Sequence, residues 1–379
     1  MAATIKRISI EGYKSIRKLD NFELRNINVL IGANGAGKSN FISFFRLLHE
    51  LIEQRLQGHL NKTEGGADAA LFMGPRETKR LDAKLYFGDN GFEFSLVPTV
   101  GNQLAFQTET TVYNSGYGPV RTLLATGHLE AKLKHHKDDP GKTGGFGVPH
   151  YIYESISNWV VYHFHDTGPL AGVRRQGAIN DNEFLRPEAE NLAAFLFKIR
   201  TTAPESYGKI RDAVRLASPF FDDFKLRPVP TNEELIALEW TQIGSDYPFR
   251  ASQLSDGTLR FMCLATALLQ PSRPPTVLFD EPELGLHPYA LALLGNLFRQ
   301  SGVWRQIIVA TQSALLLNEF APEDIIVVDR QNGESTFQRL NSEALSEWLS
   351  EYTLGELWLK NVLGGRPHQE SARMAESPS

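Results

Sequence analysis

The chain is poor in cysteine and has no long apolar segment. Its 379 residues include a single cysteine, Cys263, which excludes a disulfide framework and favours a reducing compartment. No uninterrupted apolar run approaches the ~20 residues that cross a bilayer, and the first residues lack the apolar core of a signal peptide. We therefore expect a soluble, cytoplasmic protein with no membrane partner.

An excess of basic charge is also missing. The formal net charge is −5, so no general positive field attracts nucleic acid, and any contact with DNA would need a local patch. The sequence shows no internal repeat and no heptad run of coiled-coil length. Its composition is otherwise that of a globular protein, and its length is sufficient for one large α/β domain with insertions.

The sequence does contain a glycine-rich phosphate-binding loop. Segment 32–39 has the form G-x-x-x-x-G-K-S, and it lies between a short apolar run and a stretch with helical spacing of apolar residues. The glycines let backbone N–H groups approach phosphate oxygens, Lys38 reaches the β- and γ-phosphates, and the Ser39 hydroxyl binds Mg²⁺. A chance glycine turn is the alternative. The predicted ATP-binding residues are Gly32, Asn34, Gly35, Gly37, Lys38, Ser39 and Asn40.

A second motif places two carboxylates at the end of a buried strand. The apolar segment 276–279 is followed directly by Asp280 and Glu281. In open α/β sheets the carboxyl ends of the strands bind ligands, so Asp280 is predicted to hold Mg²⁺ through water. Glu281 would polarise the attacking water and is the predicted catalytic base. The alternative is a pair of acidic residues that caps the following helix for dipole reasons alone.

Hydrophobic periodicity outlines an α/β fold. Short apolar runs predict strands at 22–31, 158–165, 276–280, 306–311 and 324–329. Alternating segments between 81 and 113 predict an antiparallel β-meander, and 4–10 and 234–243 are further strand candidates. Helices are predicted at 41–52, 188–200, 205–217, 258–269, 288–300 and 341–358. Residues 366–379 are expected to be a disordered tail.

Four motifs together resemble the ABC-type ATPase heads. They are Asn34-Gly35 within the phosphate loop and segments 254–258 (LSDGT), 280–283 (DEPE) and 285–288 (GLHP). More narrowly, they resemble the RecF/SMC-like branch, including stand-alone ATPases related to the OLD-family nucleases. The resemblance covers about 1–55 and 245–365.

This resemblance implies a mostly parallel central sheet flanked by helices, with the antiparallel β-meander in the N-terminal lobe. It also implies a single head over 1–365. Its expected parts are the phosphate-loop segment 1–55, an insertion over 56–245 with the β-meander and helices, and the lobe 246–365.

The resemblance further implies an ATP-dependent homodimer, arranged head to tail. Ser255 and Gly257 of one subunit would contact the γ-phosphate bound by the other, which suits a helix N-terminus. A simple helix cap at Ser255 or Asp256 is the alternative, and the two roles are compatible. The family usually has a switch histidine after the strand at 306–311, whereas this chain has Gln312. A glutamine can bond to a phosphate but carries no proton, so we predict modest turnover, or a structural role for Gln312.

Several other residues allow two interpretations. Lys14, in the turn Gly12-Tyr13-Lys14-Ser15, would contact the nucleotide or simply be solvated. His163 and His165 share a strand face, which suggests a metal or, as we favour, a packed polar face, and the family's glutamine loop would fall at 165–167. Arg174 and Arg175 would contact DNA or a partner, although a solvated pair is the favoured interpretation.

The functional hypothesis is a Mg²⁺-dependent ATPase in DNA metabolism or defence against foreign DNA. Only about 50 residues follow Asp329, too few for the Toprim-type nuclease of related proteins, so a separate effector protein is expected. One alternative is a nucleotide-gated scaffold with negligible hydrolysis, which measured turnover would distinguish. The other is the nucleotide-binding subunit of a transporter, which is disfavoured by the long insertion before Leu254, by Asp256 and by Gln312.

Overall fold

The structure is a computed structural model that describes residues 3–141, 145–272 and 274–365. The predicted tail, 366–379, lies outside the described residues. The chain divides into two compact units that are each discontinuous in sequence. Unit 1 consists of Met1–Arg25, Leu30–Trp159 and Pro322–Ser379, and unit 2 of Asn26–Val29 and Val160–Ala321. The single head with internal boundaries near 55 and 245 stays a prediction.

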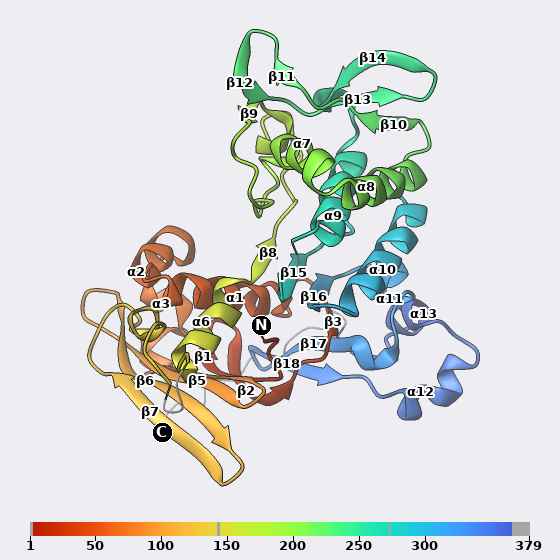
Figure 1. The fold of residues 1–379 in the computed structure, drawn as a ribbon. Helices are drawn as coiled ribbons and strands as arrows, with labels where there is room; N and C mark the ends of the chain where they lie inside the picture. Colours follow the sequence, from red (N-terminus) through yellow and green to blue (C-terminus); the bar gives the residue numbers. More distant parts are fainter. Residues whose placement is uncertain (1–2, 142–144, 273, 366–379) are drawn as a thin grey trace. The chain divides into compact units, whose positions relative to one another are not determined.

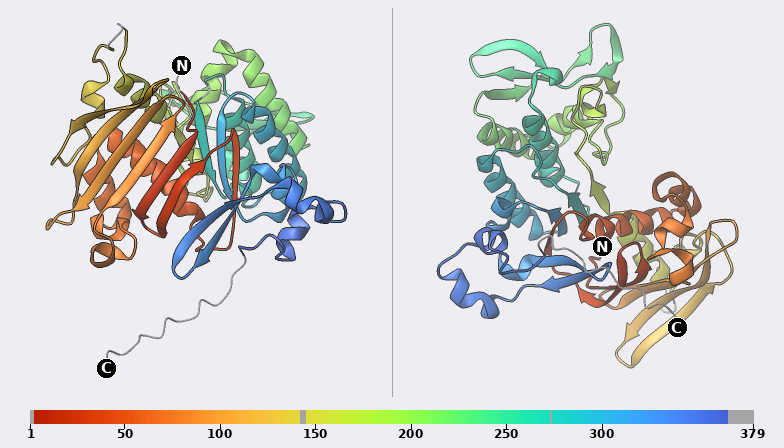
Figure 2. Two further views of the ribbon diagram at one scale, coloured as in Figure 1. Left: turned by 90° about the horizontal axis from the view of Figure 1, so that it is seen from below. Right: turned by 180° about the vertical axis from the view of Figure 1, so that it is seen from behind.

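A six-stranded antiparallel sheet dominates unit 1, in the order β2-β1-β4-β5-β6-β7 (Figures 1 and 2). The predicted meander is confirmed as β4–β6, where side chains alternate between buried and more exposed positions along β4. Sequence patterns missed β7, because its side chains are mostly exposed on both faces. The strands are β1 (Arg7–Tyr13), β2 (Ile16–Glu23), β4 (Leu81–Phe87), β5 (Asn90–Pro98), β6 (Leu104–Ser115) and β7 (Gly118–Ala125).

Helix α1 (Lys38–Ile52) follows the phosphate loop in unit 1, as predicted, and buries nine of its fifteen side chains. Its Phe45 ring packs 5.1 Å from Trp159, which follows α6 (Val148–Ser157). Short helices occupy the polar stretch after α1: α2 (Leu56–His59), the π-helix η1 (Leu60–Glu64), α3 (Ala67–Ala70), α4 (Gly74–Glu77) and, further on, α5 (Leu133–His136).

The C-terminal part of unit 1 adds two strands and two helices. β17 (Ile325–Gln331) pairs antiparallel with β18 (Glu334–Arg339), which the sequence analysis missed. The single helix predicted at 341–358 is instead α12 (Ser342–Leu349) and α13 (Leu354–Leu359). The break has a local cause, since Thr353 starts α13 with a capping box in which its side chain and that of Glu356 satisfy each other's backbone N–H groups.

Unit 2 contains the parallel strands β8 (Val160–Tyr162), β15 (Thr276–Asp280) and β16 (Gln306–Thr311). β15 and β16 have the predicted bounds, and β16 is buried throughout. The strand predicted at 158–165 is shorter, because the backbone N–H of His163 already bonds to Pro187 O at 3.0 Å. The boundary between the two units falls within β3 (Ile27–Ile31). The second six-stranded sheet has the order β18-β17-β3-β16-β15-β8. Its strands β17 and β18 belong to unit 1, and β16, β15 and β8 belong to unit 2.

Helices and small antiparallel sheets complete unit 2. α9 is buried along almost its whole length and packs against α8 and α10. The strand predicted at 234–243 is two strands, β12 and β13, and β14 follows. The helices are α7 (Leu192–Thr202), α8 (Pro204–Ala217), α9 (Asp256–Leu269), α10 (Pro288–Gly302), α11 (Ala314–Leu317) and the 3₁₀ turns η2 (Gly172–Arg174), η3 (Ala251–Gln253) and, in unit 1, η4 (Pro322–Asp324). The strands are β9 (Gly177–Ala178), β10 (Phe221–Phe224), β11 (Pro228–Val229), β12 (Asn232–Ile236), β13 (Glu239–Gln242) and β14 (Ser245–Arg250).

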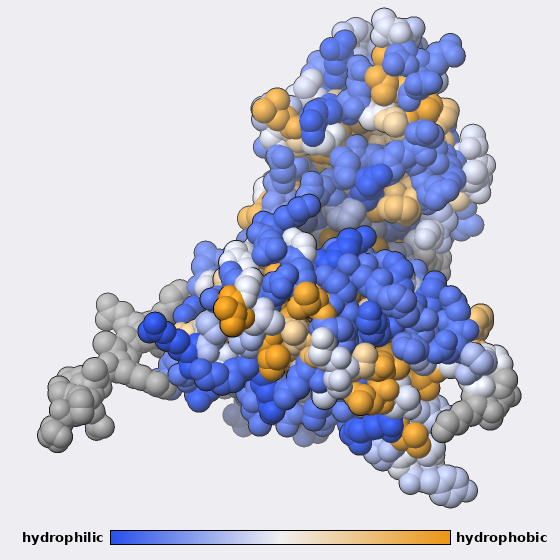
Figure 3. Space-filling model, turned by 90° about the vertical axis from the view of Figure 1, so that its left-hand side faces the viewer, coloured by the Kyte–Doolittle hydropathy of each residue, from blue (hydrophilic) through white to orange (hydrophobic). Residues whose placement is uncertain are grey.

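The surface is mainly hydrophilic on the face drawn in Figure 3, where hydrophobic residues form small separate groups. Among the described helices, none combines the length and the apolar character that a membrane span needs.

Candidate functional site

The phosphate loop joins β3 to α1 within unit 1. Gly35 and Gly37 have φ values of 77° and 117°, in the left-handed region that glycine adopts without a Cβ penalty. A Cβ at Gly32 would collide with the Val328 carbonyl oxygen, and one at Gly37 with the Ser335 hydroxyl. The loop therefore requires glycine at these positions, and it leads directly into the first turn of α1.

Lys38 lies inside this loop. Its side chain is buried, and its ammonium donates to the carbonyl oxygens of Gly32 at 2.7 Å and Ala33 at 3.1 Å. Ser39, next to it, is exposed at the start of α1. Asn40 has a supporting role in this structure, because its side-chain amide donates to Ser15 Oγ at 2.7 Å.

A layer of residues from the C-terminal strands supports the loop. The Ser335 hydroxyl lies 2.7 Å from Ser15 Oγ and 2.5 Å from Ala36 O, and Arg330 donates to Gly35 O at 3.3 Å. The backbone N–H of Ala33 donates to Gly365 O at 3.0 Å. The sequence analysis missed these contacts, since β18 carries no motif and lies about 300 residues from the loop.

Lys14 has the left-handed backbone expected of a tight turn, with φ of 46°. Its ammonium donates to Ser43 Oγ on α1 at 3.0 Å and lies 5.4 Å from the Tyr13 ring centroid. These contacts hold the turn against α1. The prediction that Lys14 contacts a nucleotide stays untested.

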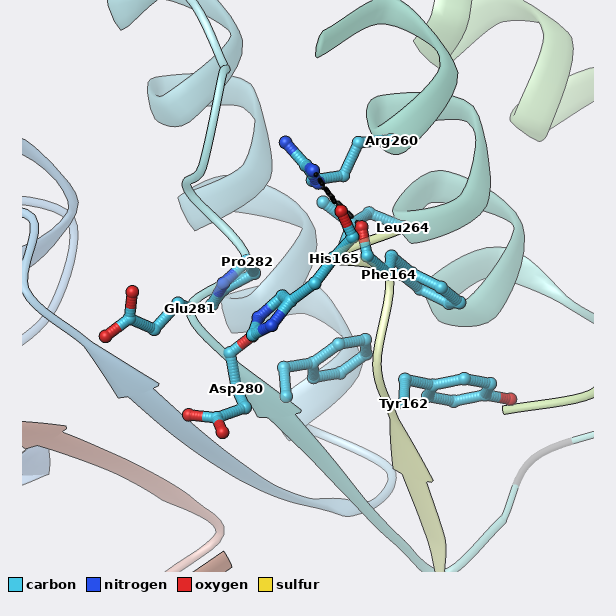
Figure 4. A pocket seen from close by; sticks show the side chains of 9 residues that line it. Tyr162, Phe164, His165, Arg260, Leu264, Asp280, Glu281 and Pro282 are labelled. Atoms are coloured by element: carbon cyan, nitrogen blue, oxygen red, sulfur yellow. Dashed lines mark hydrogen bonds between the residues drawn. The ribbon is translucent and has the colours of Figure 1, made fainter. Parts of the chain in front are cut away.

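In unit 2, β15 ends at the predicted carboxylates. The His165 ring donates through Nε2 to the backbone oxygen of Asp280 at 2.8 Å. Glu281 follows with φ of 43°, a conformation that costs a non-glycine residue about 1–3 kcal/mol and is typical of functional sites. Its backbone N–H donates to Ala310 O at 2.7 Å, which fixes this turn to β16. The two carboxylates point away from the aromatic side chains of the adjoining pocket (Figure 4).

Gln312, just after β16, connects the acidic residues. Its side-chain amide donates to Glu281 Oε1, and its backbone N–H donates to Glu283 Oε1 at 2.7 Å. Burial raises the pKa of the Glu283 carboxyl, although hydrogen bonds from Thr311 and Gln312 act in the opposite direction. Oε2 of Glu283 is buried and has no hydrogen-bond partner within the described part of the chain. Glu281, Glu283 and Gln312 thus form one cluster beside Asp280.

The LSDGT segment forms the start of α9. Ser255 is the N-cap, with its Oγ accepting from the backbone N–H of Thr258 at 3.2 Å, as the capping interpretation predicted. Ser255 and Asp256 are exposed, whereas the helix behind them is buried. A Cβ at Gly257 would collide with the Gly285 carbonyl oxygen, so the first turn of α9 packs directly on the segment after Glu281.

Comparison with known proteins decides the family. A family model described as "AAA domain, putative AbiEii toxin, Type IV TA system" matches residues 27–318. The chain belongs to this AAA-domain family. A 71-residue stretch is also 38% identical to structural maintenance of chromosomes protein 3 of Saccharomyces cerevisiae; it covers 17% of this chain and only 6% of the yeast protein.

Two solved structures share the fold of this AAA-domain protein. One is an Smc head bound to the C-winged helix domain of ScpA, with 17% identity and a TM-score of 0.56 over 90% of this chain and 99% of that one. The other is an Smc head with an extended coiled coil bound to the C-terminal domain of ScpA from Pyrococcus furiosus, with 16% identity and a TM-score of 0.51 over 92% and 98%. The predicted ABC-type α/β head fold and ATPase class are confirmed.

The favoured interpretation of one arginine of this AAA-domain protein is wrong. Arg174 is not solvated, because its side chain is only 7% exposed and bonds to the backbone of the LSDGT segment and to Asp256. The neighbouring Arg175 is exposed, as predicted. Sequence patterns could not separate them, since both stand in a glycine-containing stretch without periodicity.

The two histidines lie just after β8 rather than on a strand, and their rings pack against each other, as the favoured interpretation expected. The ring centroids of His163 and His165 lie 4.0 Å apart, and the His165 ring donates a hydrogen bond to the backbone oxygen of Asp280. No cluster of three or more His, Cys, Asp or Glu residues suited to a metal occurs among the described residues. His165 also lines the pocket beside Asp280, together with Tyr162, Phe164, Arg260, Leu264, Phe279, Asp280, Glu281 and Pro282 (Figure 4).

Proposed function

We propose that this ATPase uses ATP binding to close a head-to-tail homodimer and hydrolysis to open it. The observation that carries the proposal is the LSDGT segment, where a capped helix N-terminus presents the exposed Ser255 and Asp256 while the helix body is buried. A helix N-terminus favours an anion such as a γ-phosphate, and the exposed Ser255 hydroxyl, which bonds to Thr258 in this structure, lies at that terminus. In the proposed dimer, that phosphate belongs to the nucleotide bound by the partner subunit.

The proposed chemistry assigns one task to each group. The phosphate loop with Gly32, Asn34, Gly35, Gly37, Lys38 and Asn40 would hold ATP. Ser39 would bind Mg²⁺ directly and Asp280 through water, and the ion would neutralise phosphate charge. These residues fit the ion, since hydroxyl and carboxylate oxygens are the ligands that Mg²⁺ prefers. Glu281 takes the proton of the attacking water.

Gln312 controls Glu281 in this scheme. In the structure its amide is bonded to the carboxylate that would act as base. A γ-phosphate that accepted the same N–H would release Glu281 toward water, and the glutamine itself would transfer no proton. The left-handed backbone of Glu281 is the expected sign of a carboxylate held in one productive direction.

We infer a role in DNA metabolism or in defence, exerted through a separate effector protein in the cytoplasm. Support comes from the family's description, which includes the words "putative AbiEii toxin, Type IV TA system", and from the chromosome-maintenance protein among the matches. The two Smc heads with the same fold were each solved with a domain of another protein, ScpA.

One observation favours a second candidate, a nucleotide-gated scaffold. The bond between Gln312 and Glu281 occupies the proposed base, and a head that never breaks it would bind ATP without hydrolysing it. Release of inorganic phosphate by the purified protein under saturating Mg-ATP distinguishes the two, because a scaffold shows no turnover beyond that of a Lys38→Ala control.

The first test measures solution mass by light scattering for Glu281→Gln, with and without Mg-ATP. This variant keeps the shape of the side chain and removes the base, so ATP should convert monomer to dimer and hold it there. Adding Ser255→Arg should abolish the dimer, because it places a bulky side chain at the proposed contact with the partner's γ-phosphate. A mass that does not respond to ATP would contradict the proposed cycle.

A further inference from the structure

Arg174 forms an unusually complete set of contacts around the LSDGT segment. Its guanidinium donates to the carbonyl oxygens of Ala251 and Leu254, the latter at 3.2 and 3.3 Å, and to Asp256 Oδ1 at 2.8 Å. Its Nε donates to Thr167 O at 2.7 Å. The guanidinium has five N–H donors in a fixed fork and can serve all four acceptor groups, whereas a lysine ammonium has three donors on a single atom. All these partners lie in unit 2.

The residues that Arg174 joins belong to two different segments. On one side is the turn that precedes α9 and carries Ser255. On the other is segment 164–167, which follows β8. This second segment is held in turn by Arg260 of α9, which donates to Phe164 O at 2.7 Å, His165 O at 3.0 Å and Thr167 Oγ1 at 3.3 Å. Figure 4 shows Arg260 above the backbone of this segment.

Segment 164–167 also reaches the acidic motif. His165 donates to Asp280 O at 2.8 Å, and Arg260 donates to Leu284 O just beyond Glu281. Hydrogen bonds therefore run without a break from Asp280 through His165, Arg260 and Thr167 to Arg174 and the LSDGT turn. Both arginine side chains are almost fully enclosed and their bonds are charge-assisted, although the bond from Arg174 to Asp256 ends on an exposed carboxylate.

We propose that Arg174 is a positioning residue that couples the two ends of this hydrogen-bonded path. This inference rests on the proposed dimer cycle, in which Asp280 and Glu281 act on the subunit's own nucleotide and Ser255 acts on the partner's nucleotide. A shift of Asp280 or Glu281 on nucleotide binding moves segment 164–167, and Arg174 transmits that shift to the turn that presents Ser255. Nucleotide binding at one site thereby sets the position of the Ser255 that contacts the nucleotide of the partner subunit.

Asp256 gains a physical explanation from this arrangement. In the transporter-type motif a glycine stands at this position, and a glycine offers Arg174 no side-chain acceptor. The Asp256 side chain is 63% exposed, so its ion pair with Arg174 contributes little to the stability of the fold. Its effect is to orient the guanidinium toward the turn before α9.

The test compares Arg174→Ala with Arg175→Ala, a matched control at the exposed neighbour, both in the Glu281→Gln background. ATP affinity is measured with a fluorescent ATP analogue on dilute monomer, and dimer formation by light scattering against protein concentration. Arg174→Ala should leave ATP affinity unchanged and weaken ATP-dependent dimerisation about 10- to 100-fold, as expected for losing one or two charge-assisted bonds. Arg174→Lys should recover only part of this, and Arg175→Ala should match the parent.

Asp256→Asn provides the second measurement, for the case that Arg174→Ala does not fold. This exposed substitution should weaken dimerisation by itself, and where Arg174→Ala does fold it should have no further effect in that variant. Equal dimerisation by the Arg174 and Arg175 variants would overturn the inference while leaving the proposed cycle intact. Failure of the Glu281→Gln parent to dimerise with ATP would overturn both.

Discussion

At the scale of single residues, the candidate site depends on motif residues and on partners that come from distant segments. Lys38, Ser39, Asp280 and Glu281 were predicted because each stands at a fixed position in a motif whose glycines or apolar strand can be recognised. Partners that come from distant, unpatterned stretches could not be predicted. Arg174 is the clearest case, since its role depends on carbonyl oxygens about 80 residues away.

Glu283 yields a pH-dependent prediction. Because burial raises its pKa above the ordinary value of 4.5, the folded state binds this proton more tightly than the unfolded state. The resulting stabilisation is complete below 4.5 and is lost as pH rises through the higher folded-state pKa. Glu283→Gln imitates the protonated carboxyl and avoids that loss. The free energy of unfolding of the variant, relative to that of the wild type, should increase by about 1–3 kcal/mol as pH rises above 4.5.

Chemical denaturation of both proteins across this pH range measures the difference. Glu233→Gln, at an exposed carboxylate, is the control for the chemical change itself. A constant offset between Glu283→Gln and wild type at all pH values would show that the charge of Glu283 does not affect stability.

At the scale of helices and strands, prediction succeeded where a segment is buried on both sides. β15 and β16 have the predicted bounds because a strand with both faces covered is a continuous apolar run. Half-exposed elements gave a weaker signal: β7 and β18 were missed, and one predicted helix is two, α12 and α13. α12 buries no side chain, and the break before α13 comes from the capping box at Thr353, a local signal that the apolar pattern does not contain.

The first turn of α9 allows a test of packing within one element. Gly257→Ala should destabilise the protein by about 1–3 kcal/mol, because its Cβ would collide with the Gly285 carbonyl and push the 283–286 segment away. Gly208→Ala, in α8, meets no atom within 4 Å and should stabilise by about 0.5–1 kcal/mol through helix propensity. The measurement is the change in melting temperature of each variant relative to the wild type. Equal shifts in the same direction would mean that the contact at Gly257 is relaxed in solution.

At the scale of the whole molecule, the fold class and ATPase family followed from the order of four motifs along the chain. The family model and the Smc heads agree with that reading. The division into two discontinuous units was not predictable, because strand β3, a single apolar run in the sequence, contributes to both. The dimer cycle is likewise a property of two molecules and needs an experiment on both.

Mixing two inactive variants tests whether each active site is shared between subunits. Glu281→Gln lacks the base and Ser255→Arg blocks the partner's site, so each alone should hydrolyse little ATP. In a mixed dimer, the phosphate loop and Glu281 of the Ser255→Arg chain meet the intact Ser255 of the other chain. One of the two sites is then complete, and phosphate release should rise above the sum of the separate proteins, to at most about half of the wild-type rate per dimer.

A second mixture makes the result specific. Lys38→Ala and Glu281→Gln should not complement each other, because Lys38 and Glu281 are proposed to serve the same subunit's nucleotide. Each site of that mixed dimer keeps one defect. Recovery in the first mixture alone assigns Ser255 to the partner's site, and recovery in both would show that the lysine or the glutamate also acts across the interface. Recovery in neither, with dimers present, would leave Ser255 as a helix cap and remove the main support for a head-to-tail arrangement.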